Sequence, residues 1–478
     1  FKEKKVEEGF RKAFKGNWGS ESHTKRMGVV QDLNRLSFFG FLCHLRKVNL
    51  PMDSSAKVRE PRLLNSTQWG IICPLHSPDG GNCGLHKHLS IVNHITSGCN
   101  SQAYINYLRY LGVVMLNESS CNYLSKVTKV MLNGNWIGTT NKPLELTSLM
   151  RYHRRNNIID TYTSIFWNIQ LNEILICTDV GRPCRPVAIC ENNNELYMND
   201  KVFENIKNKT LSWLELTRGD GTKKEEKCKI IEIYEKGKEI KISTIEKLKS
   251  TAAPLEYLDT QETEGILLKM GNNKCTHSDI HPSLILGIMA NQIIFPENNP
   301  YPRNAFSCGQ AKQGVSLFHT NFTNRIDKTS YLLNYGQIPL VKSRYLKYAT
   351  KEKHPYGENA IVAIMCYSGY NVEDAVIVNR AALERGLFRT TYYNMYEAHE
   401  EKQNIGNAKV DTLFMDIMRN NVIGLKPDYD YSHLDPKTGL IKENTYVNTK
   451  TVVIGKATRS MLEKDVYIDA SKTTKKGQ

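Results

Sequence analysis

Two adjacent carboxylates, Glu373 and Asp374, stand at the connection between two apolar runs. The runs cover residues 360–366 and 375–378, and their Val and Ile content between turn residues predicts two buried strands. Carboxylates buried without partners cost several kcal/mol each, so this pair needs a cation, hydrogen-bond donors or water. Mg²⁺ takes one or two carboxylates together with water and phosphate oxygens, which makes a magnesium–phosphate site one interpretation. A solvated hairpin tip is the other interpretation, and the pair by itself favours it.

Upstream of this pair lie polar residues that suit contact with phosphate. Arg303 precedes a glycine-flanked polar run, residues 309–314, which contains Lys312 and Gln313. A guanidinium group stays charged and can donate two parallel hydrogen bonds to a phosphate. Polar runs of this kind are also common in loops that bind nothing, so the pattern leaves both interpretations open.

Three further residues are metal ligands by type: His277, Asp279 and His281. Their spacing ahead of Pro282 is not that of a zinc-binding pair on a helix. We therefore expect core or capping roles for them rather than metal ligation.

The composition predicts a globular protein of several domains that binds a polyanion. The chain has 478 residues, and 64 Lys and Arg against 49 Asp and Glu give a net charge of +15.

Its twelve cysteines include no CxxC pair, which argues against a thiolate zinc site and a disulfide scaffold and favours a reducing compartment. Apolar runs reach only about seven residues, far short of the roughly twenty needed to span a membrane. The first residues lack both a signal-peptide core and a starting Met, which suggests a piece of a longer chain.

A helix is expected over residues 143–155, because its apolar residues recur at helical spacing and Pro143 suits the first helical position. Arg151, Arg154 and Arg155 lie toward its end. A solvated face is favoured over a binding site for these three arginines.

The remaining elements are indicated more weakly. We expect a helix in residues 1–18 and an ordered irregular loop at 69–85, which either brings its backbone close to a ligand or is a structural turn cluster. A small strand-and-helix module is expected at 210–265, a buried apolar element at 283–290 and a late strand at 451–454.

Nine segments, taken in order, resemble the second-largest (β-type) subunit of multisubunit DNA-dependent RNA polymerases in its eukaryotic and archaeal form. They are GNWG (16–19), GVVQDLNR (28–35), LRKVNLP (45–51), PRLLNSTQWGIICP (61–74), PDGGNCGL (78–85), DVGRPCRP (179–186), HSDIHPSLILG (277–287), PRNAFSCGQAKQG (302–314) and SGYNVEDAVIVNRAALERGLFR (368–389). Each segment is weak alone, but together they span nearly the whole chain. The acidic pair is thereby favoured as a functional site.

The resemblance implies an α+β multidomain fold, with irregular mixed β structure and helices. The implied domains are a fork region (1–90) and two external modules (91–195 and 196–265). They are followed by a hybrid-binding domain with a sheet-rich core (266–390) and the start of a wall or flap (391–478). Fork loops near residues 15–28 and 50–60 are expected beside the nucleic acid.

The resemblance also implies roles for three residues near the nucleotide. Glu373 and Asp374 match the acidic pair near the nucleotide-borne Mg²⁺, which they would reach mostly through water. The tightly held first Mg²⁺ belongs to the largest subunit. Arg303 matches the arginine that contacts the incoming triphosphate. This agrees with the charge stabilisation that phosphoryl transfer requires.

Four more residues match nucleic-acid contacts of that family. Lys312 and Gln313 match a Lys-Gln pair near the RNA 3′ end and the hybrid. Arg62 matches a fork-loop arginine near the template, and Gln31 is expected to contact nucleic acid in the same region. No zinc site is implied within this chain.

The chain departs from the cellular pattern Cys-Pro-Ala-Glu-Thr-Pro-Glu-Gly-Gln at residues 73–81. One acidic position is His76, the other is the shorter Asp79, and the usual Gln is Gly81. A tyrosine that usually follows the triphosphate arginine is Phe306. Such divergence suggests a large DNA virus or another distant lineage.

The implied function is that of a catalytic-core piece of a DNA-directed RNA polymerase, a nucleotidyltransferase active only within its assembly. Expected partners are the largest subunit and other core subunits, template DNA, the RNA transcript and ribonucleoside triphosphates, with no membrane. The expected location is intracellular, either the nucleus or a viral factory or virion. A scaffold subunit without chemistry is the main rival, and a single-chain nuclease would need more metal ligands than this one acidic pair.

Overall fold

The computed structural model describes most of the chain, and its fold is mixed α+β, as predicted. The described residues are 3–14, 17–18, 26–27, 30–124, 127–191, 195–219, 228–237, 245–269, 274–405, 408–418, 421–460 and 465–474. The chain divides into two compact units. Unit 1 comprises Phe1–Ser316 and Gly336–Met365, and unit 2 comprises Leu317–Tyr335 and Cys366–Gln478. The five domain boundaries expected from the resemblance stay a prediction.

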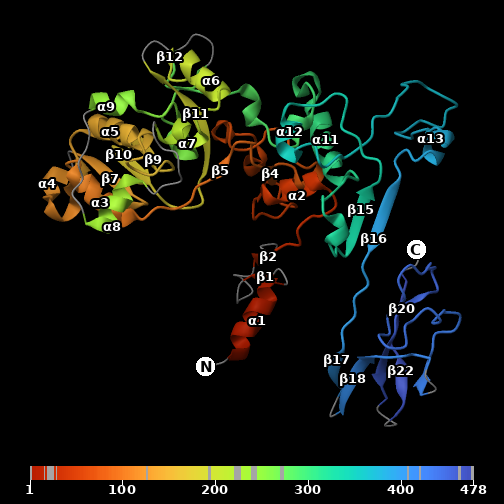
Figure 1. Cartoon of the computed structure of the whole chain (residues 1–478). Coiled ribbons are helices and arrows are strands. Elements are labelled where there is room, and N and C mark those ends of the chain that lie inside the picture. The colour runs from red at the N-terminus through yellow and green to blue at the C-terminus, as the bar shows by residue number, and fades with distance from the viewer. Residues whose placement is uncertain are drawn as a thin grey trace. The chain divides into compact units, whose positions relative to one another are not determined.

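The first sheet of unit 1 has the strand order β6–β8–β7–β10–β9, of which β7, β9 and β10 are labelled in Figure 1. These strands are β6 (Val114–Met115), β7 (Thr128–Leu132), β8 (Asn135–Thr140), β9 (Ser164–Asn168) and β10 (Glu173–Cys177). All neighbours are antiparallel except β7 and β10, which run parallel. Helices α3 (Ser101–Tyr110) and α5 (Pro143–Arg155) add Tyr104, Tyr107 and Met150 to the core that this sheet buries.

The second sheet of unit 1 is organised by one long strand, β11 (Pro183–Glu191). It pairs antiparallel with four strands that are far apart in sequence. They are β5 (His94–Ile95), β12 (Glu195–Leu196), β13 (Leu255–Asp259) and β14 (His277–Ser278). Strand β11 therefore brings segments from residue 94 to residue 278 into one sheet.

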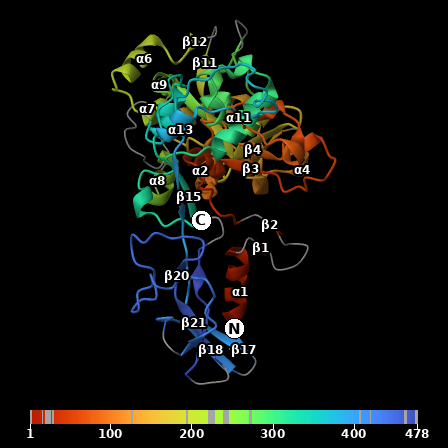
Figure 2. The same cartoon turned by 90° about the vertical axis from the view of Figure 1, so that its right-hand side faces the viewer.

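A third core in unit 1 forms around α2 (Phe38–Leu45) and α11 (Tyr301–Gln313), which are labelled in Figures 1 and 2. It buries Phe39, Cys43, Cys73, Met289, Ala290, Cys308 and Leu346. The expected apolar element at 283–290 contributes its last residues to this core. Beside it, β3 (Lys47–Asn49) and β4 (His86–His88) form an antiparallel pair.

Unit 2 consists of small antiparallel and mixed sheets. Strands β15 (Thr329–Leu333) and β16 (Thr390–Asn394) pair antiparallel. A five-stranded sheet has the order β17 (Glu401–Ile405), β18 (Ala408–Phe414), β21 (Lys456–Arg459), β22 (Tyr467–Asp469) and β19 (Val422–Ile423). The predicted late strand is confirmed as β20 (Val452–Ile454), which pairs with β23 (Lys472–Thr473).

The other helices and short strands are peripheral to these sheets. They are α1 (Glu3–Phe14), β1 (Asn17–Trp18), β2 (Arg26–Met27), α4 (Cys121–Leu124), α6 (Asp200–Lys207), α7 (Trp213–Arg218), α8 (Lys229–Lys236), α9 (Ile245–Ser250), α10 (Thr260–Thr263), α12 (Tyr345–Thr350) and α13 (Arg380–Glu384). Among the residues described, every helix is too short or too polar to cross a bilayer. The described cysteines form no disulfides.

Two strand predictions are wrong. Residues 360–366 and 375–378 form no strands, and their side chains are exposed, with Ile361, Val362 and Val376 each more than three-quarters exposed. A strand is stable only when its backbone groups pair with a neighbour and one face is covered. No strand in the described part of the chain pairs with either run. The Val and Ile content of the two runs therefore suits strands, but a strand forms only where another segment pairs with it.

The predicted helix at 143–155 is confirmed as α5, with Pro143 in its first turn, but the expected solvated arginine face is wrong. Arg154 and Arg155 are buried at 1% and 7% exposure. The Arg154 guanidinium donates to Glu262 at 2.6 Å and to Glu256 at 2.7 Å, and Arg155 donates to Glu256 at 2.8 Å. The His277 ring bonds the same Glu256 at 2.6 Å, which confirms its predicted core role. We call Arg154, Arg155, Glu256, Glu262 and His277 the buried charge cluster.

Removing Arg154 should strongly destabilise unit 1, because Glu256 and Glu262 would each lose a buried partner. We expect Arg154→Met to lower the free energy of unfolding by about 3–5 kcal/mol. Urea unfolding followed by tryptophan fluorescence measures this. The matched control is Arg109→Met, since Arg109 forms an exposed pair with Glu118 at 2.8 Å and should change stability by less than about 1 kcal/mol. Equal effects of the two substitutions would contradict the assigned role.

The buried charge cluster should also make the stability of unit 1 depend on pH. Burial alone would raise the pKa of Glu256, but the charges of Arg155 and Arg154 outweigh it and hold that pKa well below its usual range. A depressed pKa stabilises the fold above the ordinary carboxyl value, and this contribution is lost as pH falls. We expect the urea midpoint to fall between about pH 5 and pH 3, and more steeply than in Glu256→Gln. Parallel pH curves for the two proteins would refute this.

Candidate functional site

Glu373 and Asp374 lie in a turn of unit 2 where several backbone conformations are left-handed. Ser368, Gly369, Glu373 and Asp374 have φ values of 55°, 73°, 53° and 66°. For a residue with a Cβ this conformation costs about 1–2 kcal/mol, and such strain concentrates at ligand sites and switch regions. Both carboxylates are exposed to solvent. A strained turn thus presents two adjacent acidic side chains outward, although exposure is equally what a solvated tip requires.

The donor set at this turn fits a hard cation that brings other ligands with it. Among the described residues, no group of three or more His, Cys, Asp and Glu could hold a metal ion by itself. Two carboxylates match the share that proteins usually give to Mg²⁺, whose remaining ligands are water and phosphate oxygens. The pair therefore suits an ion carried by a phosphate compound better than a resident metal.

Helix α11 presents its predicted functional residues on two different faces. Arg303 and Gln313 are exposed, whereas Lys312 lies on the packing face with the buried Asn304 and Cys308, because residues four apart share one side of a helix. The polar run at 309–314 is therefore largely helical and not a loop. No carboxylate in the described residues pairs with the Arg303 guanidinium, which lies 5.7 Å from the centre of the Phe306 ring. Phe306 thus supplies an aromatic surface beneath the exposed cation.

Lys312 is fixed in place by the start of α2. The Ser37 hydroxyl accepts from the Gly40 backbone N–H at 2.9 Å, which caps α2, and donates to the Lys312 carbonyl oxygen at 2.6 Å. A Cβ at Gly40 would stand 3.0 Å from that same carbonyl oxygen, so glycine permits the close approach of α11. Ser37 is a structural residue that was not among those predicted from the sequence. A serine three residues before Gly40, at the start of an apolar run, was the available capping signal.

Arg62 holds two loops together through their backbones. Its guanidinium donates to the carbonyl oxygens of Gly81, Cys83 and Ser54 at 2.5, 2.9 and 2.9 Å. Gly84, with φ 74°, packs so closely on the Arg62 backbone that a Cβ would lie 2.4 Å from its carbonyl oxygen. The donors of Arg62 are thus used to shape the loops at 54–56 and 81–83.

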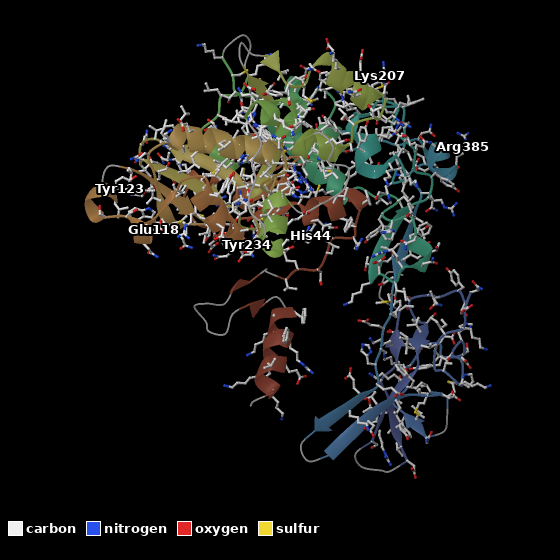
Figure 3. All side chains as sticks on the ribbon, turned by 60° about the vertical axis from the view of Figure 1, so that its left-hand side comes forward. His44, Glu118, Tyr123, Lys207, Tyr234 and Arg385 are labelled. Carbon is white, nitrogen blue, oxygen red and sulfur yellow. The ribbon has the colours of Figure 1, made fainter. Side chains whose placement is uncertain are left out.

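Gln31 meets the C-terminal end of α2, where His44 is labelled in Figure 3. The His44 Nδ1 accepts from the Asn34 backbone N–H at 3.1 Å, so its Nε2 carries the proton and donates to Gln31 Oε1 at 3.0 Å. A hollow of about 290 Å³ opens beside them, and Lys47 provides a cation in its wall. Most of the expected fork loop at 15–28 lies outside the described residues.

The predicted site residues divide between the two units. Glu373 and Asp374 belong to unit 2, and the predicted nucleotide and nucleic-acid contacts belong to unit 1. Within unit 1, Arg303 and Gln313 are both exposed side chains of α11, whereas Arg62 and Gln31 lie outside that helix in two separate segments.

Models of known protein families match three segments of this chain. Family models described as RNA polymerase Rpb2 domains 3, 4 and 6 match residues 31–95, 130–191 and 289–478. The chain belongs to the Rpb2 family of RNA polymerase second-largest subunits. The resemblance stated from the sequence is thereby confirmed.

Individual Rpb2 relatives match almost the whole chain at moderate identity. The DNA-directed RNA polymerase II subunit RPB2 of Encephalitozoon cuniculi is 35% identical over 98% of this chain and 40% of the relative. The corresponding subunit of Schizosaccharomyces pombe is 33% identical over 92% of the chain and 38% of the relative. The archaeal subunit Rpo2 of Sulfolobus acidocaldarius is 31% identical over 92% and 37%. The chain therefore spans about two-fifths of the length of these Rpb2 relatives.

Replacing Arg62 by Lys should loosen the two loops, because an ammonium group cannot reach several carbonyl oxygens in a fixed fork. We expect amide hydrogen exchange at residues 54–56 and 81–83 to accelerate about tenfold, as about 1–2 kcal/mol of local stability is lost. The matched control is Arg59→Lys, at an exposed position of the same region. Unchanged exchange in Arg62→Lys would show that the clamp contributes nothing to loop stability.

Proposed function

We propose that this chain contributes to the active centre of a DNA-directed RNA polymerase, a nucleotidyltransferase that works only as a multisubunit assembly. Its partners would be the largest subunit and other core subunits, template DNA, the RNA transcript and ribonucleoside triphosphates. Membership of the Rpb2 family supports the proposal. The observation that carries it is the exposed, strained turn holding Glu373 and Asp374, because a solvated tip has no need of two consecutive left-handed acidic residues.

Glu373 and Asp374 would help hold a Mg²⁺ ion that arrives with the nucleoside triphosphate. When bound, that ion would neutralise developing charge on the phosphates. The two carboxylates would orient the ion mainly through water, since only two donors come from this turn. Arg303, which is exposed and has no carboxylate partner among the described residues, would donate to the triphosphate and stabilise its negative charge.

The remaining predicted residues would hold nucleic acid. Lys312 and Gln313 would contact the RNA end and the hybrid, and Gln31 would face the same path. Arg62 would act mainly by shaping the fork loops, because its donors already bind carbonyl oxygens. The net charge of +15 supports electrostatic binding of a polyanion.

A scaffold subunit that supports assembly without chemistry is the second candidate. The exposed apolar side chains at 361–378, including Ile361, Val362 and Val376, favour contact with another protein segment. That observation is compatible with both functions, because a catalytic subunit must also bind its neighbours. We further propose an intracellular location, either nuclear or, for a viral chain, in a viral factory or virion.

The acidic pair distinguishes the two candidates. In the assembled polymerase, Glu373→Ala with Asp374→Ala should slow single-nucleotide addition about ten- to a hundredfold and raise the Mg²⁺ concentration required. A contact through water explains a partial loss. Extension of a preassembled DNA–RNA scaffold, scanned over nucleotide and Mg²⁺ concentrations, measures both effects.

The matched control for this experiment is Glu384→Ala, since Glu384 is an exposed acid of α13 in the same unit and forms an ion pair with Arg380. It should leave the rate and the Mg²⁺ dependence unchanged. Wild-type behaviour of the double variant, with the assembly intact, would favour the scaffold function and the solvated tip.

A further inference from the structure

A hollow in unit 2 is lined by three lysines, Lys328, Lys426 and Lys472, and its volume is about 590 Å³. Lys328 directly precedes β15, and its carbonyl oxygen accepts from the backbone N–H of Met395, just beyond β16, at 3.1 Å. Lys472 is the first residue of β23, which pairs with β20. Strands β15, β16 and β20 are labelled in Figure 1. The hollow therefore lies where the paired ends of β15 and β16 meet the segment around β23.

Two of these lysines are held by backbone carbonyl groups. The Lys426 ammonium donates to the Ser471 carbonyl oxygen at 2.9 Å. Lys472, the next residue along the chain, donates to the carbonyl oxygen of Glu397. A carbonyl group carries no net charge, so these hydrogen bonds fix the two side chains without neutralising them. Part of the entropy that a long side chain loses on binding a ligand is thereby lost already in the free protein.

The third lysine approaches the one acid that lines this hollow among the described residues. The Lys328 ammonium lies 3.9 Å from the Glu397 carboxylate, which is longer than a hydrogen bond. The two side chains are 82% and 51% exposed, so solvent screens the pair and an incoming anion can displace it. Three ammonium groups face one carboxylate, which leaves an excess of two positive charges in the hollow.

We propose that this hollow is a binding site for linked phosphate groups, in which Lys328, Lys426 and Lys472 pair with the phosphate oxygens. Lysine binds phosphate as a point charge, and Thr329 and Thr473 add hydroxyl groups to the wall. The volume admits more than one phosphate group, since a water molecule takes only about 30 Å³. A nucleic-acid strand and an inorganic polyphosphate share this chemistry. The site is built from residues outside the proposed active centre and goes beyond that proposal.

Titration of the full chain with inorganic tripolyphosphate, followed by calorimetry at low salt, tests the site. Lys426→Gln with Lys472→Gln should weaken binding about tenfold, because two of three cations are removed. The matched control is Lys437→Gln with Lys442→Gln, which removes the same charge from exposed positions outside the hollow and should change binding less than about twofold. An equal loss in the two double variants would overturn the proposal.

Two further variants separate charge from structure. Lys426→Arg with Lys472→Arg keeps both charges and should retain most of the affinity, whereas a merely structural role for the lysines would not be rescued in this way. Glu397→Gln removes the opposing charge and leaves the carbonyl oxygen that Lys472 uses, so it should tighten tripolyphosphate binding about two- to fivefold. Thermal unfolding checks that each variant folds. Unchanged or weaker binding by folded Glu397→Gln would contradict the assigned electrostatics.

The source of the phosphate is distinguished with labelled single-stranded RNA, measured by fluorescence anisotropy over a range of salt concentrations. Loss of RNA affinity in the Lys426→Gln, Lys472→Gln variant, with a shallower salt dependence than in the control, assigns the site to nucleic acid. A loss confined to tripolyphosphate assigns it to a free polyphosphate. Poly-glutamate of equal charge is the third ligand, and competition as strong as that of tripolyphosphate would overturn the phosphate assignment.

Discussion

Pairing of buried charge constrains the architecture of unit 1. Arg154 can lie at the end of α5 only because two glutamates meet it there, one from β13 and one from α10. Strand β13 is in turn paired with β11, whose Arg185 forms an ion pair with Asp279. Asp279 also accepts from the Trp69 indole N–H at 2.9 Å. Side-chain contacts and strand pairing thus join α5, β13, β11 and the irregular segment at Trp69 within unit 1.

Close approach of backbone reinforces these polar contacts. A Cβ at Gly70 would lie 2.5 Å from the Arg185 side chain, so glycine allows the guanidinium to reach Asp279. Gly40 and Gly84 have the same effect at α11 and at Arg62. These glycines therefore allow neighbouring segments to approach each other closely. The need for glycine comes from residues that are distant in the sequence, so composition alone does not reveal it.

Residue types and spacing predicted individual helices, whereas burial and strand pairing depend on residues that are distant in the sequence. Pro143 and helical spacing gave α5 correctly, but the burial of Arg154 depends on acids about a hundred residues later, which no periodicity shows. The Val- and Ile-rich runs beside Glu373 indicated strands, although a strand also needs a partner that the runs themselves do not specify. At α11, the sequence indicated both Arg303 and Lys312 as cations that suit contact with phosphate. The helix separates them into an exposed guanidinium and a half-buried amine, and only the fold shows that difference.

The clamp made by Arg62 has a consequence for sequence variation. Because its guanidinium donates to carbonyl oxygens, the clamp depends on the backbone conformation of the loops and not on their side chains. Substitutions at Ser54, Gly81 or Cys83 leave the recognised groups in place as long as the backbone can follow the same course. Gly81, where the resemblance leads one to expect glutamine, still offers its carbonyl oxygen to the guanidinium. Such a loop can diverge between lineages in its surface chemistry while it keeps its shape.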